Sequence, residues 1–520
     1  MILVLDFGSQ YTQLIAKRLR RLGFKAQVIP GNTKAAEIPA EAGVPFGIVL
    51  SGSPNSVGTG IDPDPQLLDL GVPVLGLCFG YHFLASHLGG KVEGQTHREY
   101  GAGQVRRTVD GRQDALTRAF PDTASVWMSH GDSVTRLPPG AQLLLETGKA
   151  QVAGFCVPGR RFWGLQFHPE VHHTPEGDVL LKAFAQDICG LESDWNLGDE
   201  LAQLKQKLKV EMAGVEEVVC GVSGGVDSTV LAVLLAQVVK VRALFIDHGF
   251  QREYDLTDLK KVFGRYPNIR LEVLDAREMF WSQLDGVSDP EKKRKIIGKA
   301  FIDAFYGRIK DDVAESSRHA ASGKRFLGQG TIYSDVIESA ASQMGPAHLI
   351  KSHHNVGGLP EDLPFALVEP LRAFFKDEVR EIGALLGIER EALARHPFPG
   401  PGLAIRCVGE LKPAKIEILR KADALFHQEL VQRGLYGKTW QALVVLLPVS
   451  TVGVMGDGRS YESVVAIRCV NSVDAMTAEA SELPWADLKA IASRLVNEVR
   501  GVNRVVYDLT SKPPGTIEWE

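Results

Sequence analysis

The stretch Glu217-Val-Val-Cys-Gly-Val-Ser-Gly-Gly-Val-Asp-Ser-Thr229 decides the fold of the middle of this 520-residue chain. Residues 217–221 have the pattern of a buried strand, residues 227–238 that of a helix and residues 242–247 that of a second strand. Strand, helix and strand in this order predict a parallel sheet. The glycines between the first strand and the helix let backbone N–H groups approach an anion at the helix N-terminus.

The loop itself indicates nucleotide chemistry. Its hydroxyl groups add hydrogen-bond donors, and Asp227 can hold Mg²⁺ against phosphates. No Gly-Lys-Ser/Thr follows, so this is not a Walker A loop, and a bare Gly-Gly would indicate only a turn. The string Ser-Gly-Gly-Val-Asp-Ser resembles the pyrophosphatase-type ATP loop, which implies attack on the α-phosphate with AMP and pyrophosphate as products. The ATP-binding residues that this resemblance implies are Ser223, Gly224, Gly225, Val226, Asp227, Ser228 and Thr229.

A separate α/β series precedes this one. We expect a strand at 2–6, a helix at 10–22 and further strands at 47–50, 73–77 and 162–167, separated by turns rich in Gly and Pro. A polar amphipathic helix at about 198–213 follows a break in the pattern, which indicates a domain boundary.

Cys78 lies in Gly76-Leu-Cys-Phe-Gly80, between a predicted strand and a predicted helix. Flanking glycines permit the sharp turn of a nucleophile elbow, and a helix N-terminus favours the thiolate. A buried structural cysteine is the competing interpretation when Cys78 is taken alone. Phe167-His168-Pro169-Glu170 supplies a base and a carboxylate to orient it, and Gly52 lies in a loop that can aim N–H groups at an oxyanion.

These motifs, with Asp6-Phe-Gly-Ser-Gln10 and Ser129-His-Gly-Asp132, resemble the class I glutamine amidotransferases over roughly the first 190 residues. The resemblance implies Cys78 as nucleophile, His168 as base and then acid, and Glu170 as orienting carboxylate. The family usually has Gln where this chain has His82, which leaves the glutamine contacts open. The implied oxyanion and glutamine-binding residues are Gly52, Phe79, His82, Ser129, His130 and Gly131.

The segment His396-Pro-Phe-Pro-Gly-Pro-Gly402 marks a further boundary. After it we expect strand 403–408, helix 412–433, strands 440–447 and 461–470, helix 485–499 and strand 503–509, a β-α-β-β-α-β order. The predicted fold class is therefore α/β, with two parallel-sheet α/β domains followed by a small α+β domain. The expected domains are an amidotransferase domain at 1–192, an ATP pyrophosphatase synthetase domain at 193–395 and a dimerisation and nucleotide-binding domain at 396–520.

Four later motifs indicate which acceptor receives the ammonia. They are residues 327–339, residues 350–359, residues 396–406 and the stretch 504–520. With the domain order, they resemble the glutamine-hydrolysing GMP synthetase family over the full chain. That resemblance implies that XMP is adenylated by ATP with Mg²⁺ and then aminated to GMP, with no tightly bound organic cofactor, in a homodimer formed by the C-terminal domain.

The resemblance also implies the remaining site residues. A loop that closes over phosphates would contain Lys351, His353, His354 and Asn355, although paired histidines in a loop are by themselves more typical of solvent exposure. XMP would be bound by Arg406, Lys512 and Glu518, each of which alone could equally be a surface ion pair. Related enzymes usually have Asn at position 248, where this chain has His, and we attach no function to that difference.

Composition narrows the remaining possibilities. Net charge is -5, 44% of residues are apolar and 23% are charged, which favours neither a nucleic-acid partner nor a membrane surface. The six cysteines have no C-x-x-C spacing, and Asp6 directly follows the apolar residues 1–5, so we expect a cytoplasmic protein without a signal peptide. Two alternatives stay open: another synthetase with this ATP loop, such as a glutamine-dependent NAD synthetase, and a non-catalytic nucleotide sensor.

Overall fold

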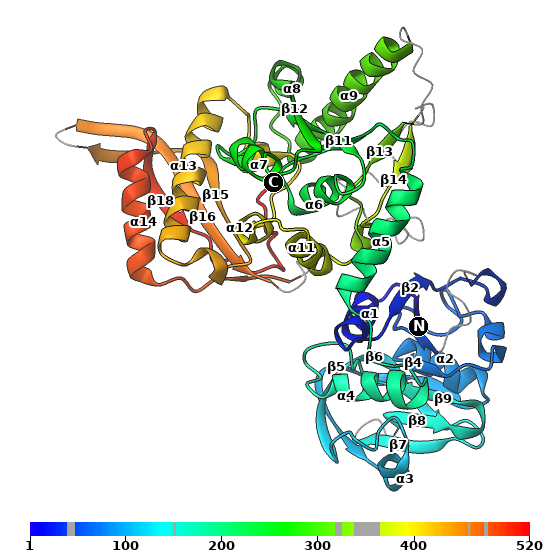
Figure 1. Cartoon of the computed structure of the whole chain (residues 1–520). Coiled ribbons are helices and arrows are strands. Elements are labelled where there is room, and N and C mark those ends of the chain that lie inside the picture. Colours follow the sequence, from blue (N-terminus) through cyan, green and yellow to red (C-terminus); the bar gives the residue numbers. More distant parts are fainter. Residues whose placement is uncertain (39–46, 149–151, 318–324, 337–364, 456–457, 473–476) are drawn as a thin grey trace. The chain divides into compact units, whose positions relative to one another are not determined.

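The structure is a computed structural model that describes the chain except residues 39–46, 149–151, 318–324, 337–364, 456–457 and 473–476 (Figure 1). Its contacts divide into two compact units. The first holds Met1–Glu200, and the second holds Leu201–Val336 together with the described residues that follow, up to Glu520. The division falls within helix α5 (Leu197–Glu211), close to the boundary helix predicted at 198–213. In the described part of the chain, no helix is both long and apolar enough to cross a membrane.

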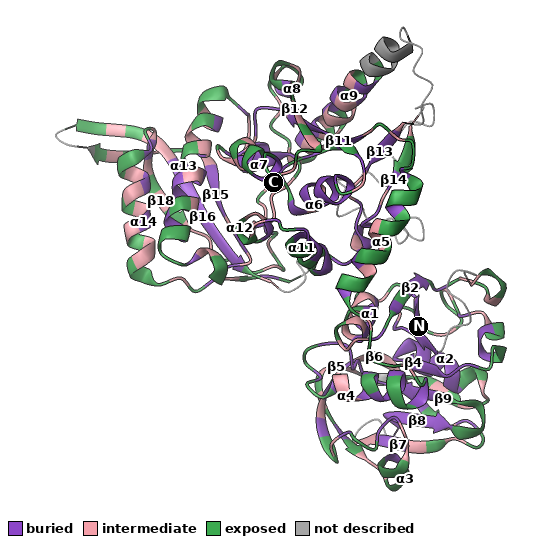
Figure 2. Ribbon diagram, in the orientation of Figure 1, coloured by how far each residue is buried: buried purple, intermediate pink, exposed green. Residues whose placement is uncertain are grey.

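The first unit is built on a nine-stranded sheet in the order β2-β1-β3-β4-β9-β8-β7-β5-β6. Five neighbouring strands are parallel and nearly all of their residues are buried, which explains their continuous apolar runs (Figure 2). They are β1 (Ile2–Asp6), β2 (Ala26–Pro30), β3 (Gly47–Leu50), β4 (Val74–Leu77) and β9 (Phe162–Leu165). Strand β2 lies on one side of β1, whereas the next strands along the chain, β3 and β4, lie on the other side, so the strand order reverses at β1. The carboxyl ends at this switch point form the usual ligand-binding edge.

The other four strands of this sheet are antiparallel, a half that the sequence analysis did not anticipate. They are β5 (Lys91–Arg107), β6 (Thr123–Arg136), β7 (Gln142–Thr147) and β8 (Gly154–Val157). Short connections join β7 to β8 and β8 to β9, and these neighbours run in opposite directions, whereas β5 and β6 are antiparallel although a helix at Val109–Gln113 lies between them in the chain. The helices of the unit are α1 (Thr12–Arg21), α2 (Phe79–His87), α3 (Val109–Gln113) and α4 (Gly177–Lys182), with 3₁₀ turns at Ala35–Glu37, Pro65–Asp69 and Pro158–Arg160 and a π-helix at Ala183–Ile188.

The second unit contains a parallel sheet in the order β12-β11-β10-β13-β14, as predicted for this series. Its switch point lies between β10 and β13, so the loop after β10 lies at the ligand-binding edge. The strands are β10 (Glu217–Gly221), β11 (Lys240–Asp247), β12 (Ile269–Asp275), β13 (Phe326–Gly328) and β14 (Ala366–Val368). The helices are α6 (Val226–Leu235), α7 (Asp255–Phe263), α8 (Arg277–Leu284), α9 (Pro290–Ser317), α11 (Lys376–Leu385) and α12 (Arg390–Leu393).

The C-terminal part of this unit is a smaller α+β arrangement. Strand β16 (Gly458–Asn471) pairs antiparallel with β15 (Gln441–Met455) and β17 (Glu479–Ala480) and parallel with β18 (Val502–Tyr507). Helices α13 (Pro413–Gln432) and α14 (Trp485–Glu498) accompany the sheet, and a 3₁₀ turn lies at Tyr436–Lys438. These elements agree with those predicted between 412 and 509.

The strand predicted at 403–408 was wrong. Residues Gly402–Ile405 form a 3₁₀ helix, and Cys407 makes only an isolated parallel bridge to Leu446. The reason is local: Gly402 has φ +63, which turns the chain after the Pro-Gly-Pro segment. The apolar run 403–405 is then buried on all sides by other elements, which a periodicity argument cannot distinguish from a buried strand.

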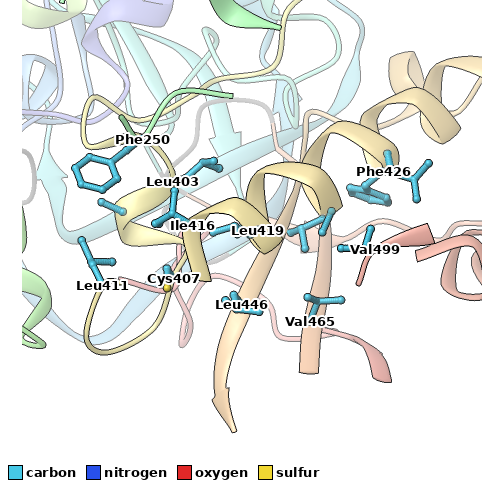
Figure 3. Packing of buried hydrophobic residues seen from close by; sticks show 14 of the residues in the cluster. Phe250, Leu403, Cys407, Leu411, Ile416, Leu419, Phe426, Leu446, Val465 and Val499 are labelled. Carbon is cyan, nitrogen blue, oxygen red and sulfur yellow. The ribbon is translucent and has the colours of Figure 1, made fainter. Parts of the chain in front are cut away.

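One apolar cluster joins this turn to its surroundings. Figure 3 shows Leu403 and Cys407 packed with Phe250, with Ile416 and Leu419 of α13 and with strand residues such as Leu446. The cluster contains residues from both sides of position 396. Consequently, the segment that carries Arg406 is held between the ATP-loop sheet and the C-terminal sheet.

Candidate active sites

Cys78 lies at the turn between β4 and α2, in a conformation that few residues adopt. Its φ is 52° and its ψ is -101°, a strained backbone of the kind found at nucleophile elbows. A Cβ at Gly76 would clash with the carbonyl oxygen of Gly80, and one at Gly80 with that of Leu50. Both glycines are therefore required by the close packing of this turn. The thiol donates to the carbonyl oxygen of Ser129, with Sγ and O 3.5 Å apart.

His168 and Glu170 follow β9, next to β4 in the sheet, and both are buried. His168 Nδ1 donates to Glu170 Oε1 at 2.7 Å, which leaves Nε2 for the thiol. Burial alone would lower the pKa of His168. The charge of Glu170 and hydrogen bonds with Cys78 and Glu170 outweigh burial and hold that pKa well above its usual value. The imidazole is thus basic enough to accept the thiol proton.

The backbone around His168 is fixed by neighbouring elements. Its carbonyl accepts from Thr174 Oγ1 at 2.7 Å, and its N–H donates to the Trp127 carbonyl at 3.1 Å. Arg18 of α1 donates to the Pro169 carbonyl at 2.5 Å, and the Tyr11 ring meets the imidazole edge-on with centroids 4.9 Å apart. Such support keeps a catalytic side chain in one orientation.

The loop after β3 reaches the same place. A Cβ on Gly52 would lie 3.1 Å from His168 Cε1, so this position admits no larger residue without displacing the imidazole. Ser51 anchors the loop by accepting from the Phe7 N–H at 3.2 Å. Phe79 is the first residue of α2 and is buried beside Cys78. The structure therefore brings the predicted oxyanion residues Gly52 and Phe79 next to Cys78 and His168.

His82 is buried within α2. Its Nε2 lies 2.9 Å from Gln166 Oε1, and burial lowers the pKa of His82 to about 4. His130, on β6, donates from Nδ1 to the Asp132 carbonyl at 2.9 Å, and its Nε2 faces Glu99 Oε2 at 3.4 Å. Burial likewise lowers the pKa of His130. Both imidazoles are held neutral at pH 7 beside the Cys78 site, and Ser129 and Gly131 flank His130 on the same strand.

The ATP loop occupies the turn between β10 and α6. Gly224 has φ +78, Gly225 is the N-cap residue of α6, and Thr229 Oγ1 donates to the Gly225 carbonyl at 2.8 Å. Ser223 Oγ accepts from the Gly225 N–H at 3.3 Å. The predicted ATP residues 223–229 thus surround one helix N-terminus, which favours phosphate.

Asp227 has two different oxygen environments. Lys376, at the start of α11 and 149 positions away in sequence, donates to Asp227 Oδ2 at 2.8 Å. Oδ1 is buried and has no hydrogen-bond partner among the described residues. A free carboxylate oxygen beside a phosphate site suits Mg²⁺, which takes few protein ligands and completes its shell with phosphate oxygens and water. Sequence reasoning missed Lys376, because no local motif marks it.

The residues predicted for XMP are arranged around the chain's final segment. Arg406 is fully buried and forms a two-bond pair with Glu518, Nε to Oε2 at 3.0 Å and Nη2 to Oε1 at 2.8 Å. Gln441 Nε2 donates to the same Glu518 oxygen, Oε1, at 2.7 Å, a partner that the sequence analysis missed. Lys512 is half-buried, and its backbone pairs with Ala478. The structure therefore brings Arg406 and Glu518 together.

The loop predicted to close over the phosphates lies outside the described residues. It contains Lys351, His353, His354 and Asn355. Their assignment stays a prediction.

Comparisons with known proteins agree with this layout. Residues 3–188 match the glutamine amidotransferase class-I family, residues 200–295 the NAD synthase family and residues 428–519 the GMP synthase C-terminal domain family. An amidotransferase unit joined to a unit with an ATP-loop sheet defines the class of glutamine-dependent synthetases.

Full-length relatives identify the family. Proteins named GMP synthase [glutamine-hydrolyzing] from Chlorobaculum tepidum and Thiobacillus denitrificans are each 47% identical, covering 100% of this chain and 99% of the relative. One from Rhodopseudomonas palustris is 48% identical, with 100% of this chain and 96% of the relative covered. The chain belongs to the family of glutamine-hydrolyzing GMP synthases.

Proposed function

We propose that this chain makes GMP from XMP, with ATP as activating substrate and glutamine as nitrogen donor. Family membership over the full chain supports this, and the observation that carries it is the presence of both chemical sites in one polypeptide. The NAD synthase match is confined to residues 200–295, the part that contains the shared ATP loop. An NAD synthetase is therefore not favoured.

Glutamine is hydrolysed at Cys78. His168 takes the thiol proton, the thiolate attacks the side-chain amide carbon, and N–H groups of Gly52 and Phe79 stabilise the oxyanion. The proton then passes from His168 to the leaving ammonia, and a thioester forms. Water, deprotonated by His168, releases glutamate and restores the thiol. Glu170 stays ionised and holds the imidazole in the productive orientation.

ATP is bound by the loop at 223–229. Backbone N–H groups at the N-terminus of α6 and the hydroxyls of Ser223 and Ser228 hold the β- and γ-phosphates, while Thr229 Oγ1 supports the loop through its hydrogen bond to the Gly225 carbonyl. Asp227 would hold Mg²⁺, which supplies positive charge to the phosphates when bound. Oxygen O2 of XMP attacks the α-phosphorus, pyrophosphate leaves, and ammonia then displaces AMP to give GMP.

XMP is bound near Arg406, Lys512 and Glu518, with Gln441 added by its hydrogen bond to Glu518. Arg406 and Lys512 would bind the nucleotide phosphate, and Glu518 would accept a hydrogen bond from the purine. Lys351, His353, His354 and Asn355 would belong to a loop that closes over the phosphates. With these assignments, residues 1–192 form the amidotransferase domain, residues 193–395 the ATP pyrophosphatase synthetase domain and residues 396–520 the dimerisation and XMP-binding domain.

The active form is a homodimer formed by the C-terminal segment. Hairpin β15–β16 presents apolar side chains to solvent: Val452 and Tyr461 face each other in register and are 51% and 67% exposed, and Val454 is 78% exposed. Exposed apolar patches of this kind are typical of subunit interfaces. Val454→Glu should shift the sedimentation coefficient to that of a monomer.

We also propose a cytoplasmic location, since all six cysteines are buried and free.

A coupled assay tests the proposed function. Purified protein receives Mg²⁺-ATP and glutamine with either XMP or deamido-NAD, and GMP, AMP, pyrophosphate and glutamate are measured. GMP formed with equimolar AMP is the expected result. Consumption of deamido-NAD without use of XMP would overturn the proposal, as would binding of XMP and ATP without turnover, which is the behaviour of a sensor.

A further inference from the structure

Asp255, the first residue of α7, is a buried carboxylate between two guanidinium groups. Its Oδ1 accepts from Arg252 Nε at 3.1 Å and Nη2 at 2.9 Å, and from Arg395 Nη2 at 2.7 Å. Oδ2 accepts from the Arg252 backbone N–H at 2.9 Å. The Asp255 side chain is 3% exposed and that of Arg395 12%. Charge-assisted hydrogen bonds that are shielded from water are the strong ones, so this arrangement is rigid.

Arg395 connects Asp255 to the ATP loop. Its Nη1 donates to the Gly224 carbonyl at 2.8 Å, and Gly224 has φ +78. The C=O and N–H of one peptide group point in opposite directions. Holding the Gly224 carbonyl therefore fixes the Gly225 N–H on the other side of that peptide, where Ser223 Oγ accepts from it at 3.3 Å. Arg395 thus sets the direction of a backbone donor in the loop proposed to bind phosphate.

Arg252 connects Asp255 to the proposed XMP residues. Its guanidinium lies over the Phe398 ring at 4.2 Å from the centroid, and the Arg406 guanidinium lies 4.9 Å from the same centroid. Arg406 in turn forms the two-bond pair with Glu518. A continuous series of contacts therefore runs from Gly224 through Arg395, Asp255, Arg252 and Phe398 to Arg406 and Glu518.

Charge balance explains why Asp255 matters most in this series. Three guanidinium groups lie close together, and like charges repel strongly when water is excluded. The carboxylates that offset them are Asp255, Asp423, which is 3.5 Å from Arg406, Glu518 and the more exposed Asp258, which is 3.4 Å from Arg395. Without the charge of Asp255, Arg252 and Arg395 repel each other, and both the ATP loop and the Phe398 stack lose their anchor.

We propose that Asp255 is a positioning residue that couples the ATP loop to the Arg406–Glu518 pair, so that each nucleotide strengthens binding of the other. This rests on the proposed function, in which ATP binds at 223–229 and XMP at Arg406 and Glu518. Coupling between sites needs a physical connection on which both ligands act. In the proposed function, ATP contacts one end of this series, at Gly224, and XMP the other, at Arg406 and Glu518.

Asp255→Asn tests the proposal, with Asp258→Asn as matched control. Asp258 lies on the same helix, one turn away, and 3.4 Å from the same Arg395 Nη2, but it is 48% exposed. With ammonium as nitrogen donor, D255N should raise the KM of both ATP and XMP by about tenfold or more, the effect of losing one charge-assisted hydrogen bond. The value of kcat should stay within about threefold, because no reacting group is touched. D258N should match the unaltered protein.

Binding measurements give the decisive readout. The dissociation constant of XMP is measured with and without a non-hydrolysable ATP analogue. The analogue should tighten XMP binding in the unaltered protein and in D258N but not in D255N. Unchanged coupling in D255N would overturn the inference. If D255N unfolds, Arg395→Lys is used in its place. The shorter lysine side chain has one ammonium group and cannot bind Gly224 and Asp255 at the same time. Unchanged coupling in that variant would also overturn the inference.

Two further variants separate this inference from the proposed function. Glu518→Gln and Arg406→Lys should raise the KM of XMP. If neither changes it, the proposed XMP site has failed; if both do and D255N does not, only the role of Asp255 has failed.

Discussion

His168 Nδ1 and Glu170 Oε1 lie 2.7 Å apart, and both side chains are shielded from water. This pair decides the protonation behaviour of the imidazole, because burial acts against the charged form and Glu170 more than offsets it. The same pair leaves Nε2 available to Cys78. Glu170 therefore both orients the imidazole and favours its protonated form.

Glu170→Gln should reduce the kcat of glutamine hydrolysis by about 10²–10⁴, the range seen when the orienting carboxylate of a triad is neutralised. Without that charge, burial remains the main influence and the pKa of His168 falls. The rate of glutamate release, measured as a function of pH, would show the lower kcat. Glu176→Gln, exposed on the following loop, is the matched control. Ammonium-driven GMP formation should be unchanged, and equal loss of both activities would contradict a local effect.

Cys78→Ala should abolish use of glutamine and leave amination of XMP by added ammonium intact. The thiol belongs to the first compact unit, whereas the ATP loop belongs to the second, so the substitution removes one chemistry without touching the other. GMP formation is followed with glutamine and with ammonium chloride in parallel. Loss of the ammonium-driven rate would argue that the two sites are not chemically independent.

Lys376→Met should raise the KM of ATP by about 10- to 100-fold in the ammonium-driven reaction. Lys376 donates to Asp227 at 2.8 Å, and losing a hydrogen bond to a charged group costs about 1.5–3 kcal/mol. Pyrophosphate release at varied ATP gives the KM. Lys240→Met, exposed at the start of β11, is the control and should not differ from the unaltered protein. Equal KM values for ATP in the two variants would show that Lys376 does not contribute to ATP binding.

Lys293→Met should destabilise the second unit by about 3–5 kcal/mol, the cost of leaving one partner of a buried ion pair alone. Lys293 is fully buried in α9, donates to the Cys407 carbonyl at 2.9 Å and pairs with the Glu520 carboxylate. Urea unfolding is the measurement. Lys295→Met, exposed on the same helix, should cost far less. Adding Glu520→Gln to K293M should recover part of the loss, and no recovery would contradict the ion-pair explanation.

His248→Asn should reduce the acid sensitivity of the fold. The imidazole packs among Phe250, Phe280 and Phe301 and accepts from the Phe250 N–H, and burial lowers the pKa of His248 to about 3. The unfolded chain, with a pKa near 6.5, binds the proton more readily, so stability falls as pH drops from about 6.5 towards 3.

Between pH 7 and pH 5 this histidine should cost about 2 kcal/mol. Asn keeps an acceptor for the Phe250 N–H but does not titrate. The free energy of unfolding, measured at several pH values, should therefore fall less steeply in H248N. His87→Asn, which replaces an exposed histidine, should leave the slope unchanged. Identical slopes in H248N and the unaltered protein would refute the assignment.

Much of this architecture could be predicted because its signals are local. A buried parallel strand is a continuous apolar run. In the turn after β4, a side chain at Gly76 or Gly80 would clash with backbone, and the turn after β10 needs a positive φ at Gly224. Residues 403–408 were wrongly predicted as a strand, because an apolar run buried by several elements has no periodicity that separates a strand from a tight turn. The antiparallel half of the first sheet was missed because no strand was predicted at β5 to β8; β6, for example, alternates buried and more exposed residues and is not a fully buried run.

By itself, the sequence determined which chemical groups this protein carries and the order in which they occur: a thiol, an imidazole and a carboxylate in the first 170 residues, and an ATP loop at 223–229. Only the tertiary structure decided which of them meet. Lys376 reaches Asp227 across 149 positions, Arg406 pairs with Glu518 across 112, and Arg395 reaches Gly224 across 171. Single contacts between distant segments have no local signature, because each is positioned by the packing of whole helices and strands, and folding alone brings the donor within hydrogen-bond distance of its acceptor.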